Sequence, residues 1–244
     1  MQSTQGDRRQ VTDAMTWTSV DRLSFTIRPV ETDDDLRKVR ELRAACYGRN
    51  APALREHMAH PDAIDHLPST CVFLCEDKSS GAAIGSMRVV DNTHGGTLEI
   101  EEFLEVPEWM RADRRGEMTR LVVAPGSDPL VKPALWKAGY LRCLQSRVQW
   151  LVIGARKPGL IKQYEYLGAR DLYGDQRLVP LGHGWSLPHR IFVLDIVSAA
   201  DDWYAARHRL LRFMVETEHP DIRISSVQRR PAATGRQLTL VASA

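Results

Sequence analysis

The spacing of apolar residues divides the first third of the chain into a strand, a helix and a hairpin. Residues 25–30 are mostly apolar or β-branched and end at a proline, which predicts a strand. Apolar residues then recur at helical spacing from Leu36 to Cys46, so a helix is expected from about residue 32 to Tyr47. Two apolar runs, 71–75 and 83–90, flank a polar turn and predict an antiparallel hairpin.

The second half alternates strands and helices. A strand is expected over residues 117–124, followed by a helix that begins near Lys132, because Pro133 lacks the N–H of a helix interior. Residues 148–154 are almost continuously apolar, as in a buried central strand. A short helix, three further strands and a last helix follow, at 160–167, 170–173, 178–181, 191–196 and about 198–213. This order predicts an α/β (α+β) fold, with a mixed central sheet flanked by helices.

The two ends of the chain lack such periodicity. We therefore expect a flexible N-terminal tail over residues 1–20, a single domain over 21–222 and a flexible C-terminal tail over 223–244. The composition is that of an ordinary globular protein, with 43% hydrophobic and 26% charged residues. A net charge of +2 gives no argument for nucleic acid binding.

Cysteine usage and hydropathy bear on the compartment. The four cysteines form no CxxC pair, which favours free thiols in a reducing compartment. No apolar run reaches the roughly 18 residues of a membrane span, and the N-terminus carries no signal-peptide pattern. A cytoplasmic location is therefore expected. A group of histidines and aspartates within residues 57–66 matches no standard metal spacing, so no metal site is predicted.

The strand over residues 117–124 carries the candidate chemistry. Glu117 and Arg120 lie three residues apart, and the strand ends in a Pro125-Gly126 break just before a helix. In open α/β folds, ligands bind outside the carboxyl ends of strands, beside helix N-termini. Glu117 is a candidate proton acceptor, and the alternative is a structural ion pair with Arg120 or Arg88.

Four patches together resemble a known superfamily. They are Arg43 four residues before Tyr47, Asp62-x-x-Asp65, the strand 85–90 (Gly-Ser-Met-Arg-Val-Val) and the strand 116–123 (Gly-Glu-Met-Thr-Arg-Leu-Val-Val). Over roughly residues 25–173 the chain resembles the GNAT acyltransferases, and within them the N-acyl amino acid synthases and the LuxI-type acyl-homoserine-lactone (autoinducer) synthases. The resemblance implies a GNAT-like sheet and an acyltransferase enzyme.

The resemblance also implies roles for individual residues. Glu117 and Arg120 are then catalytic, and the backbone N–H groups of Val122 and Val123 polarise the thioester carbonyl. The substrate-binding residues are Arg88, Arg43, Asp62 and Asp65. For these four charged residues a fixed ionic network is the alternative, and both roles can hold together.

The donor is inferred from a missing motif. Ordinary GNAT acetyltransferases carry a glycine-rich R/Q-x-x-G-x-G/A loop for the pyrophosphate of coenzyme A, whereas residues 125–132 here read Pro-Gly-Ser-Asp-Pro-Leu-Val-Lys. This favours an acyl-phosphopantetheine arm on an acyl carrier protein, with acyl-CoA as the alternative donor and no permanently bound cofactor. Lys132 and Arg142 are candidates for docking the acidic carrier protein.

The acceptor is expected to be the amine of an amino acid or a related small metabolite, and the acyl chain is expected to be long. The Trp and Phe that help bind S-adenosylmethionine in homoserine-lactone synthases have no match after Tyr47. Three alternatives remain open. They are a homoserine-lactone synthase acting on S-adenosylmethionine, a CoA-dependent GNAT N-acetyltransferase, and a non-catalytic module that binds acyl chains or carrier protein.

Overall fold

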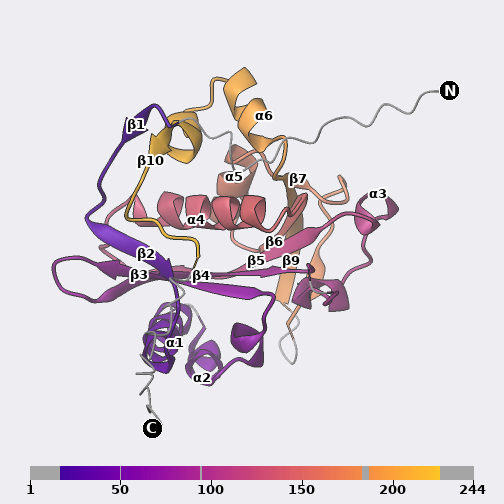
Figure 1. Cartoon of the computed structure of the whole chain (residues 1–244). Coiled ribbons are helices and arrows are strands. Elements are labelled where there is room, and N and C mark those ends of the chain that lie inside the picture. Colours follow the sequence, from indigo (N-terminus) through magenta and orange to yellow (C-terminus); the bar gives the residue numbers. More distant parts are fainter. Residues whose placement is uncertain (1–16, 50, 94, 183–186, 226–244) are drawn as a thin grey trace, which may run out of the picture.

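The computed structural model describes residues 17–49, 51–93, 95–182 and 187–225. Its centre is an eight-stranded sheet in the order β2-β3-β4-β5-β6-β9-β7, with β8 paired to β9 (Figure 1). The strands are β2 (Phe25–Pro29), β3 (Thr70–Asp77), β4 (Ala83–Asp91), β5 (Arg115–Val123), β6 (Trp150–Ala155), β7 (Arg170–Asp171), β8 (Val179–Leu181) and β9 (Leu187–Asp195).

The sheet is mixed, as the sequence predicts. Strands β2 to β5 pair antiparallel with one another, β5 pairs parallel with β6, and β9 is antiparallel to its neighbours β6, β7 and β8. The parallel pair is joined by a crossover through a helix, which a parallel connection requires. β5 therefore lies at the centre of the sheet and forms, with β6, the one parallel pair among the described strands of this sheet.

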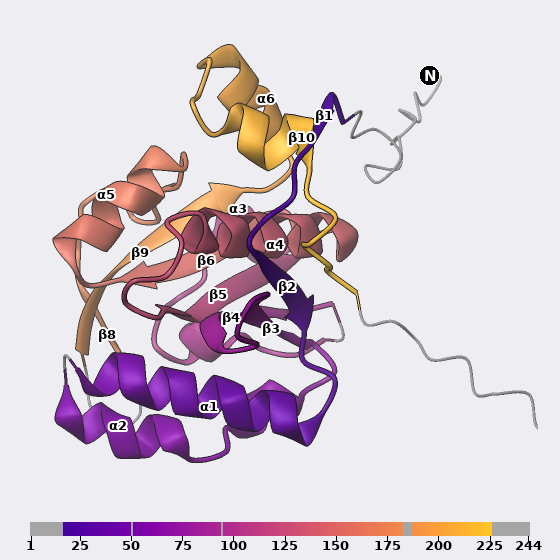
Figure 2. The same cartoon turned by 90° about the vertical axis from the view of Figure 1, so that its left-hand side faces the viewer.

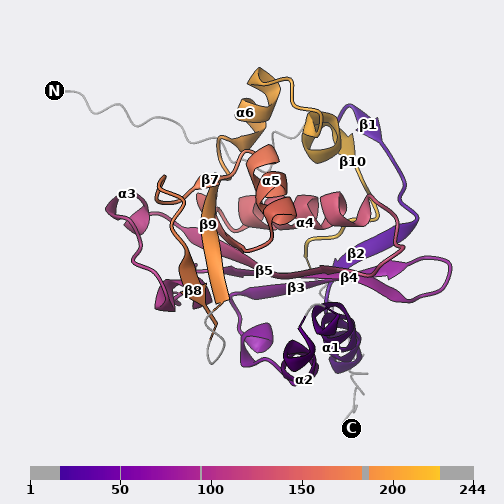
Figure 3. The ribbon, with the colours of Figure 1, turned by 180° about the vertical axis from the view of Figure 1, so that it is seen from behind.

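Helices cover both faces of the sheet (Figures 1, 2 and 3). One face is covered by α1 (Asp33–Gly48) and α2 (Pro52–Ala59), and the other by α4 (Val131–Gln145) and α5 (Pro158–Tyr166). The 3-10 turn η2 (Ala63–His66) joins α2 to β3, and the turn η3 (Glu99–Glu102) and the short helix α3 (Glu108–Arg111) lie between β4 and β5. The larger part of the core lies under α4, where side chains such as Met87, Met118 and Phe192 are buried.

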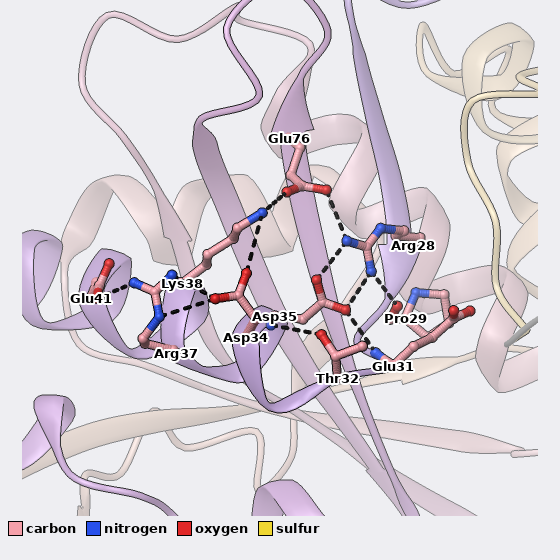
Figure 4. Close-up of polar contacts among 10 residues, drawn as sticks. All are labelled: Arg28, Pro29, Glu31, Thr32, Asp34, Asp35, Arg37, Lys38, Glu41 and Glu76. Atoms are coloured by element: carbon pink, nitrogen blue, oxygen red, sulfur yellow. Dashed lines mark hydrogen bonds and ion pairs between the residues drawn. The ribbon is translucent and has the colours of Figure 1, made fainter.

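The junction between β2 and α1 is fixed by an ionic cluster (Figure 4). The hydroxyl of Thr32 accepts the N–H of Asp35 at 3.1 Å, which is the expected N-cap bond. The carboxylate of Asp35 receives the N–H of Glu31 and both terminal nitrogens of Arg28, at 2.7 and 2.6 Å. Arg28 also contacts Glu76 on β3, so the start of the helix is tied to two strands.

The two ends of the described chain meet beyond α4. β1 (Ser19–Val20) pairs parallel with β10 (Thr217–Glu218), so residues 19 and 20, which the sequence assigns to the N-terminal tail, form a strand. Lys137 on α4 is buried and donates to the backbone carbonyls of Phe213 and Thr217 and contacts Nδ1 of His219. Residues 1–16 and 226–244 of the predicted tails lie outside the described part.

The prediction of one continuous last helix is wrong. The chain forms α6 (Ala199–Ala205), a turn, and the π-helical segment η4 (Arg212–Glu216). The break falls at Arg207, whose φ of 47° is left-handed, and the N–H of His208 returns to the carbonyl of Trp203 at 2.9 Å. Such a left-handed residue ends a helix, although the apolar spacing continues past it. Within the described residues, no helix is both long and apolar enough to cross a membrane.

Candidate functional site

The sheet opens between β5 and β6. These strands pair from Arg115–Trp150 to Met118–Ile153, and beyond that point β5 runs to Val123 and β6 to Ala155 without further pairing among the described residues. At the same level β5 contains a bulge, since its register with β4 shifts between Ser86–Val122 and Arg88–Thr119. Arg120 lies in this bulge with a φ of 55°, a conformation that costs a non-glycine residue about 1–2 kcal/mol.

A cavity of about 450 Å³ lies beside this opening, between the sheet and the α1–α2 layer. Its polar wall is formed by Arg43, Asp62, Glu99, Glu117, Thr119 and Arg120. Its apolar wall includes Leu54, Met58, Ile64, Ile100, Phe103 and Leu181. The cavity thus joins an apolar wall to a strongly charged one, and convergent polar groups beside an apolar surface are typical of ligand sites.

Glu117 forms part of the wall of this cavity. Its residue is 3% exposed, and its Oε2 accepts the backbone N–H of Ile100 at 3.0 Å. Burial raises the pKa of Glu117 from 4.5 to about 7, although the hydrogen bond from Ile100 favours the ionised form. A carboxyl group with a pKa near 7 exchanges protons readily at neutral pH, which is the property a general base needs.

Arg88 is fully engaged in an ionic network. Its residue is 0% exposed, and its Nε donates to the Thr119 hydroxyl at 3.0 Å. Its Nη1 contacts Asp62 at 2.7 Å and Asp65 at 3.3 Å, and its Nη2 contacts Glu99 at 2.5 Å. Burial alone would lower the pKa of Arg88, but the surrounding carboxylates outweigh it and raise that pKa. Every guanidinium nitrogen of Arg88 therefore has a protein partner.

Arg43 and Arg120 complete the network. Nη1 of Arg43 pairs with Asp65 at 2.5 Å, and both side chains are almost completely buried. Nη2 of Arg120 lies 3.5 Å from both Asp62 and Glu99, and its side chain is 20% exposed. The structure thus brings together the six charged residues that the sequence analysis proposed as catalytic or substrate-binding: Glu117, Arg120, Arg88, Arg43, Asp62 and Asp65.

Val122 and Val123 lie beside the opening but face opposite ways. The N–H of Ala124 donates to the carbonyl of Ile84 on β4 at 2.8 Å. Because N–H directions alternate along a strand, the N–H of Val122 also points to β4 and that of Val123 points to the open edge. The carbonyl of Val123 faces the same edge and accepts the thiol of Cys46 from α1 at 3.7 Å.

Lys132 and Arg142 lie far apart on α4. They are separated by ten residues, about 15 Å along a helix axis. Lys132 is in the first turn and contacts Gln163 of α5 at 3.3 Å. Arg142 is in the last turn and lies 3.8 Å from Asp91. The structure therefore does not join the two residues into one patch.

Two residues of the site were missed by sequence reasoning. Glu99 supplies the third carboxylate of the network, and Thr119 accepts from Arg88. Two carboxylates, those of Asp62 and Asp65, cannot balance the charges of three buried or half-buried arginines. This imbalance was the signal in the sequence that a further carboxylate, here that of Glu99, must lie nearby. His57 and His60 also line the cavity, but no group of three or more potential metal ligands occurs within the described chain.

Comparison with known proteins identifies the fold. No protein-family model matches the chain, and no curated protein matches its sequence. Among solved structures, FeeM, an N-acyl amino acid synthase from uncultured soil microbes, matches with a TM-score of 0.57. That match covers 78% of this chain and 98% of FeeM at 14% sequence identity. The fold is that of the GNAT acyltransferases.

A second structure with the GNAT fold is also similar. BjaI, a CoA-dependent acyl-homoserine lactone synthase, matches with a TM-score of 0.51 at 15% identity, over 80% of this chain and 94% of BjaI. At sequence identities this low, the similarity concerns the fold alone. The mixed sheet and GNAT-like architecture expected from the sequence are therefore confirmed.

Proposed function

We propose that this protein is an N-acyltransferase that moves an acyl group from a thioester to the amine of an amino acid or a related small metabolite. The observation that carries the proposal is the position of Glu117. It is a buried carboxyl group with a pKa of about 7, in a cavity that adjoins the opening between β5 and β6. The GNAT fold supports the same reaction class.

The reaction needs a neutral amine, a route for its proton and a stabilised oxyanion. In the proposed mechanism the amine nitrogen attacks the thioester carbonyl carbon, and the C–N bond forms as the carbonyl oxygen becomes an oxyanion. Ionised Glu117 accepts the proton from the nitrogen, directly or through water. The C–S bond then breaks as the C=O bond re-forms, and the departing thiolate takes the proton from Glu117, which returns to its ionised form.

The open edge of β5 suits the thioester. The N–H of Val123 points to this edge, so it can donate to the oxygen of the thioester carbonyl as negative charge develops there. Arg120 lies at the bulge beside Thr119, where its positive charge contributes to the field at the reacting carbonyl. The N–H of Val122 points to β4, so Val122 would contribute only by holding β5 in register with Ser86 of β4.

The start of α4 supports a donor without a diphosphate. A helix N-terminus binds phosphate through free N–H groups, and the dipole there favours negative charge. Here the carboxylate of Asp128 already occupies that position, accepting the N–H of Leu130 at 2.8 Å and the hydroxyl of Ser24 at 2.7 Å. Pro129 and Pro133 carry no N–H at all. We therefore favour an acyl-phosphopantetheine on acyl carrier protein over acyl-CoA.

The proposal is tested with purified protein and with each acyl group supplied on two carriers. Hexadecanoyl and octanoyl groups are each supplied on acyl carrier protein and on CoA, with a mixture of the twenty amino acids, and the products are identified by mass spectrometry. N-acyl amino acids that are absent from reactions with Glu117→Gln support the proposal. Acyl lactones formed from added S-adenosylmethionine would replace it with homoserine-lactone synthesis. Acyl-donor binding without any product, equal in the wild type and Glu117→Gln, would favour a binding module.

A further inference from the structure

Arg43 has hydrogen-bonding capacity that the protein leaves unused. Its residue is 2% exposed, and its Nη1 is bound to Asp65. Its Nε and Nη2 are buried and have no hydrogen-bond partner among the described residues. Buried guanidinium nitrogens are almost always paired, so two unpaired donors on one side chain require an explanation.

Arg88 has the partners that Arg43 lacks. Arg88 is equally buried, yet it contacts Asp62, Asp65, Glu99 and Thr119, and those carboxylates raise its pKa. For Arg43 the balance is reversed, because burial outweighs the attraction of Asp65 and lowers the pKa of this arginine. A further anion next to Arg43 would offset this cost of burial.

An anion that reaches Arg43 would come from the cavity. The residue forms part of the cavity wall, together with Glu117 and Arg120. Nε and Nη2 form one edge of the planar guanidinium, and this edge matches the two oxygens of a carboxylate. Neutral amines, polyamines and amides offer no group that matches it.

We infer that the Nε/Nη2 edge of Arg43 binds the carboxylate of the acceptor, so that the acceptor is an amino acid and not an amine without an acidic group. The inference rests on the proposed function for the presence of an acceptor in this cavity. Of the two fully buried arginines of the network, it assigns this role to Arg43, because every guanidinium nitrogen of Arg88 already has a partner. Arg43 would thereby hold the amine within reach of the carboxyl group of Glu117.

Binding in the absence of any acyl donor tests the inference. Each of the twenty amino acids and its carboxamide is titrated into the wild-type protein by calorimetry, at constant ionic strength. We expect at least one amino acid to bind and its carboxamide to bind about 10- to 100-fold more weakly, which is the range for a charge-assisted bidentate pair. Equal binding of an acid and its carboxamide, or no binding of any of the twenty acids, overturns the inference.

Two variants assign the effect to the unpaired edge. Arg43→Lys keeps a positive charge beside Asp65 but has no Nε/Nη2 edge, so it should bind acid and carboxamide alike. The control is Arg37→Lys, on the exposed face of the same helix, which should discriminate as the wild type does. Arg43→Lys that still prefers the acid would contradict the inference. If Arg43→Lys does not fold, the inference is decided by whether the wild type binds the acid more tightly than its carboxamide. If the wild type prefers the acid to the carboxamide but transfers an acyl group to no acceptor, the proposed function is wrong and the carboxylate site still stands.

Discussion

Ile100 and Glu117 are joined by a hydrogen bond from the backbone N–H of Ile100 to Oε2 of Glu117, at 3.0 Å. Ile100 directly follows Glu99, whose carboxylate lies 2.5 Å from Nη2 of Arg88. A single turn, η3, thus carries a partner of the candidate base and a partner of the buried arginine. The chemistry of Glu117 and the stability of the network are therefore coupled through one short segment.

Replacing Glu117 with glutamine should remove proton transfer without removing the hydrogen bond from Ile100, because the amide oxygen of glutamine still accepts it. General-base catalysis contributes about 10²- to 10⁴-fold, so kcat should fall by that factor while KM for the donor changes little. Steady-state kinetics with the acyl donor that gives product in the assay under "Proposed function" measure both values. Glu105→Gln, on an exposed side chain, is the control and should retain wild-type rates. A Glu117→Gln variant with normal kcat would exclude the proposed base.

The pH dependence of stability should also depend on Glu117. Its pKa is raised from 4.5 in the unfolded chain to about 7 in the folded protein, so the native state binds the proton more tightly. This contribution is fully present below pH 4.5 and is lost as the pH rises through 7, where an ionised carboxylate must be buried. At pH 8 the loss is on the order of 3 kcal/mol. Urea unfolding should find Glu117→Gln more stable than the wild type at pH 8 and similar to it at pH 4.5. A stability difference that does not change with pH would contradict the assigned pKa.

The fold could be predicted because its signals are local. The hairpin around residues 78–81, the N-cap at Thr32 and the continuous apolar strand at residues 150–155 each depend on neighbouring residues only. The left-handed residue Arg207 could not be predicted, because a non-glycine helix end has no such signal and depends on how α6 packs.

The site was only partly predictable, for a related reason. Motif spacing identified Glu117, Arg88 and the Asp62–Asp65 pair, but Glu99 lies in a turn whose position depends on the whole sheet. The opening between β5 and β6 and the bulge at Arg120 are matters of strand register, which no local pattern encodes. The different roles of Arg88, which is fully paired, and Arg43, which has two unpaired nitrogens, likewise depend on contacts in three dimensions.

Removing Arg88 should destabilise the protein strongly. Arg88→Met leaves the carboxylates of Asp62, Asp65 and Glu99 without their shared partner, and breaking a buried ion pair in this way costs about 3–5 kcal/mol. The free energy of unfolding in urea at pH 7 gives the value directly. Arg114→Met, whose side chain makes only an exposed contact to the carbonyl of Ser146, should change stability by less than about 0.5 kcal/mol. A loss below 1 kcal/mol for Arg88→Met would mean that the network is not a structural unit.

Charge reversal on α4 should separate the two proposed docking residues. Lys132 lies in the first turn of the helix that follows β5, whereas Arg142 lies in the last turn next to Asp91. Lys132→Glu should therefore raise KM for the carrier-linked donor several-fold, and more at low salt than at high salt, because such attraction is screened. Arg142→Glu should have the smaller effect. The same KM for acyl carrier protein in the wild type and Lys132→Glu would remove Lys132 from the docking surface.

A methyl group at Gly154 should narrow the cavity selectively. Gly154 forms part of the cavity wall, and a Cβ built there would lie 2.9 Å from Cδ1 of Leu181 and 3.7 Å from the ring of His189. Leu181 also lines the cavity, and its side chain can shift, so Gly154→Ala should fold while the space for substrate shrinks. We expect KM to rise several-fold for the largest accepted substrate and to change little for the smallest. Gly139→Ala is the matched control, since its Cβ would meet Met87 in the core under α4, 2.7 Å from Cε. That variant should alter stability and leave substrate preference unchanged. Equal KM changes for large and small substrates in Gly154→Ala would show that this wall of the cavity does not contact them.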